Sequence, residues 1–347
     1  MKRAVLLFLA VLLLTTGVSA AADGLDGFLP SELTDPAPRE ILPRTLSLLG
    51  ERVRSAVADA LREETRGAVR LVLLALVCAL AAPLEREGSR LVPLLGVLGT
   101  AVLAAGRLDA MLCLGAATAE ELGTLAHLLL PTIAAAMAAG GLAATAGAVQ
   151  VTTLFASDAF AALLRALLLP LIGCCVGLAS AEAILGDGRL GDTVTALEKL
   201  IARVLTGLTL AFTVYLKLTG VLAGSADRAA AKAAKAAVAA FIPVIGGILS
   251  EAADGVLAGA AALRGTLGAL GVAAIVLLCA APMTRLAFEY LLFRFASFAA
   301  ALIGVREVQR FLARLGTAFS LLLALTAAQA AMLLVSLLVA ATASVGG

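Results

Sequence analysis

Long apolar segments recur along most of this chain and constrain its fold more than any other feature. Their lengths fit a bilayer core of about 30 Å, the second only if it is tilted or the bilayer is locally thinned. Composition agrees, because 62% of residues are hydrophobic and only 14% are charged. The sequence therefore predicts an all-α, polytopic transmembrane helical bundle of about eight spans. We place these spans at 68–84, 91–106, 124–147, 159–182, 201–222, 238–260, 266–288 and 317–340. Residues 289–316 could form a ninth, short span or an interfacial helix.

The N-terminal residues predict that the chain is targeted to the secretion machinery. Residues 1–20 read as a signal peptide, with Lys2 and Arg3 before an apolar core and small residues for cleavage, although an uncleaved first span is the alternative. Residues 21–66 combine a proline-rich linker with an amphipathic helix, expected to lie on the outer membrane surface or to dock on a partner. The transmembrane domain is expected over residues 67–340.

Basic residues in the loops suggest an orientation. With the N-terminus outside, most of the lysines and arginines between spans fall on the cytoplasmic side, as the positive-inside rule expects. This layout puts Arg165, Arg306 and Arg314 on the cytoplasmic side, and Arg107 and Arg189 on the outer side.

Proline spacing suggests an internal repeat over residues of about 120–222 and 232–335. Pro131 and Pro170 are separated by as many residues as Pro243 and Pro282. Three spans per copy would make the second copy inverted in the membrane, as in many transporters. Chance alignment of four prolines is the alternative.

Two apolar segments, 128–141 and 241–255, are interrupted by proline and glycine. Unsatisfied backbone is costly in lipid, so such segments indicate discontinuous or re-entrant helices near mid-membrane. Kinked but continuous helices with glycine at close contacts fit equally well. The residues that we select as motif or structural positions are Pro131, Gly140, Gly141, Lys235, Phe241, Pro243, Gly246, Gly247, Glu251, Asp254, Gly271 and Pro282.

Acidic residues next to apolar segments are the other candidates. Asp158, Glu182, Glu251 and Asp254 could line a polar pathway or bind a cation, or could face water at span ends. His127 is the only histidine and has no metal ligands at suitable spacing. No catalytic motif, phosphate loop or nucleic-acid-binding pattern is found in the sequence, which predicts neither an enzyme nor a cofactor or metal site.

The run from Lys235 to Gly271, KAAVAAFIPVIGGILSEAADGVLAGAAALRGTLGALG, resembles the stage III sporulation protein AE family. The earlier LLLPTIAAAMAAGG run, residues 128–141, is similar to a second segment of that family. One departure is Arg264, where the family more often has lysine, so the charge is kept.

The resemblance implies a multi-pass subunit of the mother-cell membrane that faces the forespore. It implies a trans-envelope secretion or feeding channel, needed for endospore formation and late forespore gene expression. The implied partners are other stage III A sporulation proteins including a cytoplasmic ATPase, a forespore-side channel partner and the lipid bilayer. The alternative is a self-sufficient secondary transporter, which would move small solutes in liposomes that contain only this protein.

Overall fold

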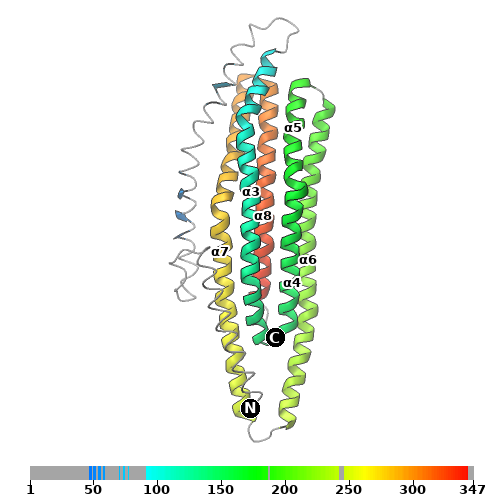
Figure 1. The fold of residues 1–347 in the computed structure, drawn as a ribbon, viewed down its shortest axis with the longest axis vertical. Helices are drawn as coiled ribbons and strands as arrows, with labels where there is room; N and C mark the ends of the chain where they lie inside the picture. Colours follow the sequence, from blue (N-terminus) through cyan, green and yellow to red (C-terminus); the bar gives the residue numbers. More distant parts are fainter. Residues whose placement is uncertain are drawn as a thin grey trace.

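The computed structural model describes residues 91–186, 188–241 and 246–342, with isolated positions between 47 and 77. Side chains in the helices are described over 94–186, 189–218 and 266–340. Every element in this part of the chain is helical, which confirms the all-α prediction (Figure 1). The elements are α3 (Leu91–Ala139), α4 (Ala143–Leu163), the π-helical turn η3 (Leu164–Leu168), α5 (Leu169–Leu185), α6 (Gly188–Phe241), α7 (Gly246–Ile303) and α8 (Arg306–Thr342).

Glycines with positive φ mark three reversals of the chain. Gly141, Gly186 and Gly304 have φ angles of 81°, 70° and 89°, a left-handed conformation that glycine adopts without steric cost. Each ends a helix, and the next helix runs back antiparallel beside it (Figure 1). The helices joined by these three glycine turns therefore run antiparallel within one elongated bundle.

A π-helical turn joins α4 to α5 without a break in direction. Pro170 lies at the start of α5, directly after η3. Proline has no backbone N–H and its ring crowds the carbonyl four residues earlier. The wider π turn accommodates this proline and keeps the helix continuous.

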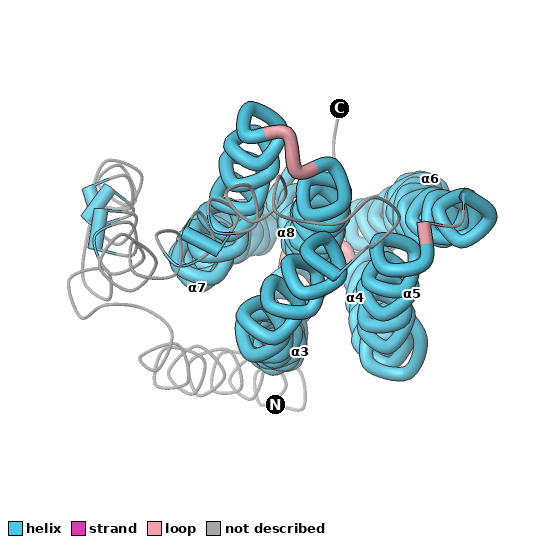
Figure 2. Tube along the Cα trace, turned by 90° about the horizontal axis from the view of Figure 1, so that it is seen from above, coloured by secondary structure: helices cyan, strands magenta, loops and turns pink. Residues whose placement is uncertain are grey.

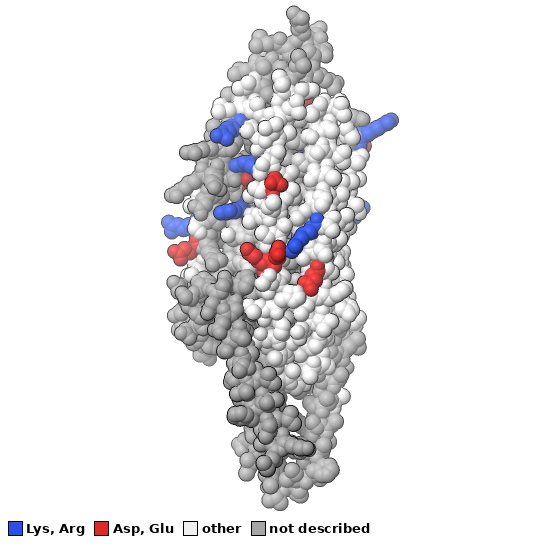
Figure 3. Space-filling view, viewed as in Figure 1, with Lys and Arg blue, Asp and Glu red and all other residues white. Residues whose placement is uncertain are grey.

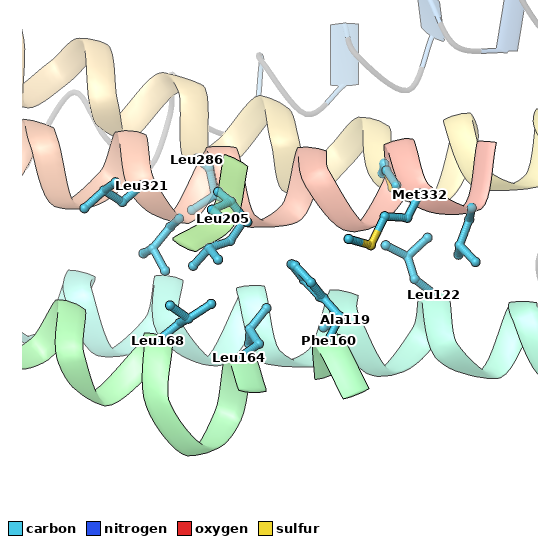
Figure 4. Packing of buried hydrophobic residues seen from close by; sticks show 14 of the residues in the cluster. Ala119, Leu122, Phe160, Leu164, Leu168, Leu205, Leu286, Leu321 and Met332 are labelled. Atoms are coloured by element: carbon cyan, nitrogen blue, oxygen red, sulfur yellow. The ribbon is translucent and has the colours of Figure 1, made fainter. Parts of the chain in front are cut away.

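Helix α8 lies at the centre of the bundle and contacts α3, α4, α5, α6 and α7 (Figure 2). The core is aliphatic and aromatic. Phe160 of α4, Leu122 of α3 and Met332 of α8 point into the space between their helices (Figure 4). Phe293 and Phe319 stack with ring centroids 5.0 Å apart and join α7 to α8.

Five of the described helices are long and apolar enough to cross a membrane. They are 94–139, 143–185, 189–218, 266–303 and 306–340. This supports a multi-pass membrane protein but does not confirm eight spans. The spans expected at 91–106 and 124–147 are not separate, because α3 continues through both of them until the turn at Gly140–Gly141.

The inverted repeat is not confirmed by the described helices. The helix that carries Pro170 and the helix that carries Pro282 run in the same direction (Figure 1). The helices that come after them, α6 and α8, also share a direction. The expected signal peptide at 1–20, and the span at 68–84 apart from isolated positions, lie outside the described residues, and so does most of the segment 21–66.

Candidate functional site

A half-buried charged cluster joins α5, α6 and α8 near the end of the bundle that holds the Gly186 and Gly304 turns. Glu182 lies in the last turn of α5, where the backbone N–H of Gly186 donates to its carbonyl at 2.8 Å. Glu198 projects from α6 and Arg314 from α8. The two turns bring these three side chains together from distant parts of the sequence.

Arg314 contacts all three polar groups of the cluster. Its Nη1 donates to Glu198 Oε2 at 3.1 Å, and its Nη2 donates to the Gly191 carbonyl at 3.1 Å. Its Nε lies 3.6 Å from Glu182 Oε2. The exposed fractions of the three side chains are 24%, 13% and 14% for Arg314, Glu182 and Glu198. A planar guanidinium suits such multi-point contact, so Arg314 connects three helices.

Gly191 permits the close approach of α6 to Glu182. A Cβ placed on Gly191 would collide with the carboxylate of Glu182 and lie 2.8 Å from its carboxylate carbon. The residue also supplies the carbonyl that accepts from Arg314. Any larger side chain there would push Glu182 away from Arg314.

A second interhelical pair lies between α3 and α7. Arg107 Nη1 is 3.2 Å from Glu289 Oε2, and Glu289 is only 2% exposed. A buried carboxylate is costly unless it is paired, so this contact fixes the register of the two helices.

Charged pairs also lie on the exposed face of α3, α4 and the π-helical turn η3. Arg165 Nη2 is 3.5 Å from Glu120 Oε2, and His127 Nε2 is 3.0 Å from Asp158 Oδ1. All four side chains are about half exposed or more. Charged groups are spread over the upper and middle part of the described surface rather than confined to its ends (Figure 3).

The interior also contains uncharged polar groups. Thr153 donates to Ser336 at 2.8 Å, and Gln329 Nε2 donates to the Ala119 carbonyl at 2.9 Å. Among the described residues, Ser157 Oγ and Gln329 Oε1 are buried without a hydrogen-bond partner. No group of three or more His, Cys, Asp or Glu side chains in the described ranges could hold a metal ion.

The family model described as stage III sporulation protein AE matches residues 38–344. The chain belongs to the stage III sporulation protein AE family. Membership implies a role in sporulation, and the helices agree with a multi-pass membrane protein.

One curated relative is the stage III sporulation protein AE of Bacillus subtilis (strain 168). It is 30% identical over 169 residues, which are 47% of this chain and 41% of the relative. The match to that relative thus spans less than half of either chain. No solved structure matches.

The segment that carries the resemblance to the stage III sporulation protein AE family is only partly described. Pro243 lies outside the described residues. Lys235 and Phe241 belong to the last part of α6, and Gly246, Gly247, Glu251 and Asp254 to the first part of α7, but their side chains are outside the described set.

The remaining motif positions do not form one site. Pro131 is exposed within α3, and Pro282 is buried within α7. Gly140 and Gly141 form the α3–α4 turn, where the chain reverses direction. Gly271 is a close contact, because an added Cβ would lie 2.9 Å from Leu337 and 3.1 Å from Leu129.

The charged cluster was only partly foreseeable. Glu182 stands out in the sequence as an acid beside an apolar segment. Glu198 and Arg314 look like loop charges, and the loop assignment put Arg314 and Arg189 on opposite sides of the membrane. In the structure Arg314 contacts the Gly191 carbonyl, two residues from Arg189, so both arginines lie at the same end of the bundle.

Proposed function

We propose that this protein is a non-enzymatic, integral membrane subunit of a trans-envelope channel between mother cell and forespore. The observation that carries the proposal is the family match over residues 38–344, on a chain with five helices able to span a membrane. The channel would be a secretion or feeding complex, required for endospore formation and late forespore gene expression.

The proposed location is the mother-cell membrane that faces the forespore. The partners would be other stage III A sporulation proteins, among them a cytoplasmic ATPase, and a forespore-side channel partner. An external ATPase would supply the energy for which this sequence has no phosphate loop of its own. In this proposal residues 1–20 direct export, and the segment 68–84 adds a further span to the five described helices.

The test is deletion in the native spore-forming host, scored by heat-resistant spores and by a forespore reporter expressed after engulfment. We expect normal vegetative growth, loss of heat-resistant spores and no late reporter signal, with recovery when the wild-type chain is restored. Normal sporulation of the deletion strain would refute the proposal.

A second arm addresses the transporter alternative. The purified protein is placed in liposomes without partners, and uptake of small solutes is measured with and without an ion gradient. The channel-subunit proposal expects no uptake above that of empty liposomes. Ion-driven uptake by the protein alone would favour a secondary transporter.

A further inference from the structure

An open pocket of about 260 Å³ lies beside the charged cluster, between the helices that meet near the Gly304 turn. Arg294 of α7 and Gln309, Arg310 and Arg314 of α8 line it, with Glu182 of α5 on one wall. Three arginines from two helices thus face one cavity with one carboxylate.

Arg314 is already neutralised. Two carboxylates and a backbone carbonyl take its three contacts, so it forms the floor of the pocket rather than a free cation. Glu182 is held by the same contact.

Arg294 is different, because no carboxylate of the described residues lies within 4.0 Å of it. The aliphatic part of its side chain packs against Gly316, where an added Cβ would lie 3.6 Å from Arg294 Cγ. Its guanidinium carbon lies 5.6 Å from the centre of the Tyr290 ring. These contacts position the side chain without neutralising its charge.

Arg310 is weakly paired. Its Nη2 lies 3.7 Å from Glu307 Oε1 on the same helix, and the exposed fractions of the two side chains are 50% and 36%. An exposed pair of this kind contributes little to stability, because solvent screens it. An anion with better geometry could displace Glu307.

We propose that this pocket binds a phosphate-bearing anion, held by Arg294 and Arg310 with the Gln309 side-chain amide as a further donor. The planar fork of arginine matches phosphate oxygens and gives short, charge-assisted hydrogen bonds. Basic pockets between membrane helices commonly bind lipid headgroups. A lipid headgroup and a free phosphate both present anionic phosphate oxygens to the arginines. The wall formed by Glu182 restricts the anion to the Arg294–Arg310 side. This inference is independent of the proposed channel function.

The test uses the purified full-length protein, stripped of lipid in a neutral detergent. Inorganic phosphate and phosphatidylglycerol are added separately, with phosphatidylcholine as the neutral lipid, and binding is measured by thermal shift and native mass spectrometry. The variants are Arg294→Gln, Arg310→Gln and the double variant. Arg285→Gln is the matched control, because Arg285 is an exposed arginine of α7 that does not line the pocket.

We expect each pocket variant to lose about tenfold in affinity, the range of one charged hydrogen bond, and Arg285→Gln to bind like the wild type. Binding of phosphatidylglycerol alone supports the site with a lipid headgroup as ligand, and binding of inorganic phosphate supports it with a free phosphate. No saturable binding of either probe would refute the site. So would an equal loss in Arg285→Gln, or unchanged affinity in a folded double variant.

Discussion

At the scale of single residues, Arg314 has three polar contacts to lose, two with carboxylates and one with a backbone carbonyl. In Arg314→Ala the carboxylates of Glu182 and Glu198 would face each other without the cation that now contacts both. Breaking a fully buried ion pair costs about 3–5 kcal/mol, so for this half-buried cluster we expect a loss of about 2–3 kcal/mol of unfolding free energy. Denaturant unfolding in detergent measures it.

The matched control for this prediction is Arg310→Ala, one turn earlier on α8. Its pair with Glu307 is long and exposed, and its removal should change stability by less than about 1 kcal/mol. Adding Glu198→Gln to Arg314→Ala should recover part of the loss. Equal stability of the two single variants would show that the cluster does not hold these helices together.

Gly271 is a tight contact between α7, α3 and α8. In Gly271→Val the new side chain would overlap Leu337 and Leu129, and such overpacking typically costs about 1–3 kcal/mol. Gly123→Val is the control, because apart from its chain neighbours and the nearby backbone of its own helix no atom lies within 4 Å of the Cβ position at Gly123. Thermal unfolding of both variants measures the difference. A Gly123→Val variant as destabilised as Gly271→Val would assign the effect to β-branching in a helix, not to packing.

Gln329 combines one buried hydrogen bond with one buried oxygen that has no partner among the described residues. Gln329→Leu removes that oxygen at similar volume, so we expect stability within about 1 kcal/mol of the wild type, or above it. Gln329→Ala leaves a cavity and should cost about 2 kcal/mol or more. Unfolding midpoints of the two variants give the comparison. A large loss in Gln329→Leu would instead mean that the oxygen is satisfied by a group such as an internal water.

At the scale of helices, the sequence predicted apolar segments well but divided them wrongly. Arg107 and Glu120 look like loop residues, so the prediction ended one span at residue 106 and began the next at 124. In the structure Arg107 pairs with Glu289 and Glu120 with Arg165, and α3 runs through both positions. A hydropathy window cannot detect this, because each partner lies on another helix.

Chain turns could be predicted from the sequence better than contacts between side chains on different helices. The Gly140–Gly141 pair was identified from the sequence as an interruption, and the positive φ of Gly141 explains why glycine is needed there. That the chain reverses at this point depends on how α4 packs against α3, which a local pattern does not contain.

The packing of α4 on α8 can be tested by a designed disulfide. Thr153 Oγ1 and Ser336 Oγ lie 2.8 Å apart, so cysteines at both positions should fall within the narrow geometry of a disulfide. The five native cysteines are first replaced by alanine. We expect Thr153→Cys with Ser336→Cys to cross-link under mild oxidation, seen as a reducible mobility shift.

Thr152→Cys with Ser336→Cys is the control pair. Thr152 is also buried, but successive side chains on a helix point in directions about 100° apart. The control should remain uncross-linked. Cross-linking of both pairs, or of neither, would contradict the described packing of α4 and α8.

At the scale of the whole molecule, the helices are longer than a bilayer is thick. The 49 residues of α3 extend roughly 74 Å at about 1.5 Å per residue, against a bilayer of about 40–45 Å including headgroups. Part of the bundle must therefore extend beyond the membrane or contact other proteins. Exposed charged pairs in the middle of the helices, such as Arg165 with Glu120, agree with a bundle that lies only partly in the membrane.

The helix arrangement also predicts on which side of the membrane Arg189 and Arg306 lie. For these two residues, the charge of the loops and the structure give different answers. The positive-inside assignment puts Arg189 outside and Arg306 in the cytoplasm. In the structure α6 and α8 both begin at the same end of the bundle, and Arg314 reaches the Gly191 carbonyl there (Figure 1).

An impermeant maleimide should therefore label Arg189→Cys and Arg306→Cys, each in a cysteine-free background, from the same side of oriented vesicles. Both side chains are exposed, so reagent access is equal at the two positions. Labelling from opposite sides would support the predicted inverted repeat. It would also show that α5, α6 and α8 do not meet at the Arg314 cluster in the membrane.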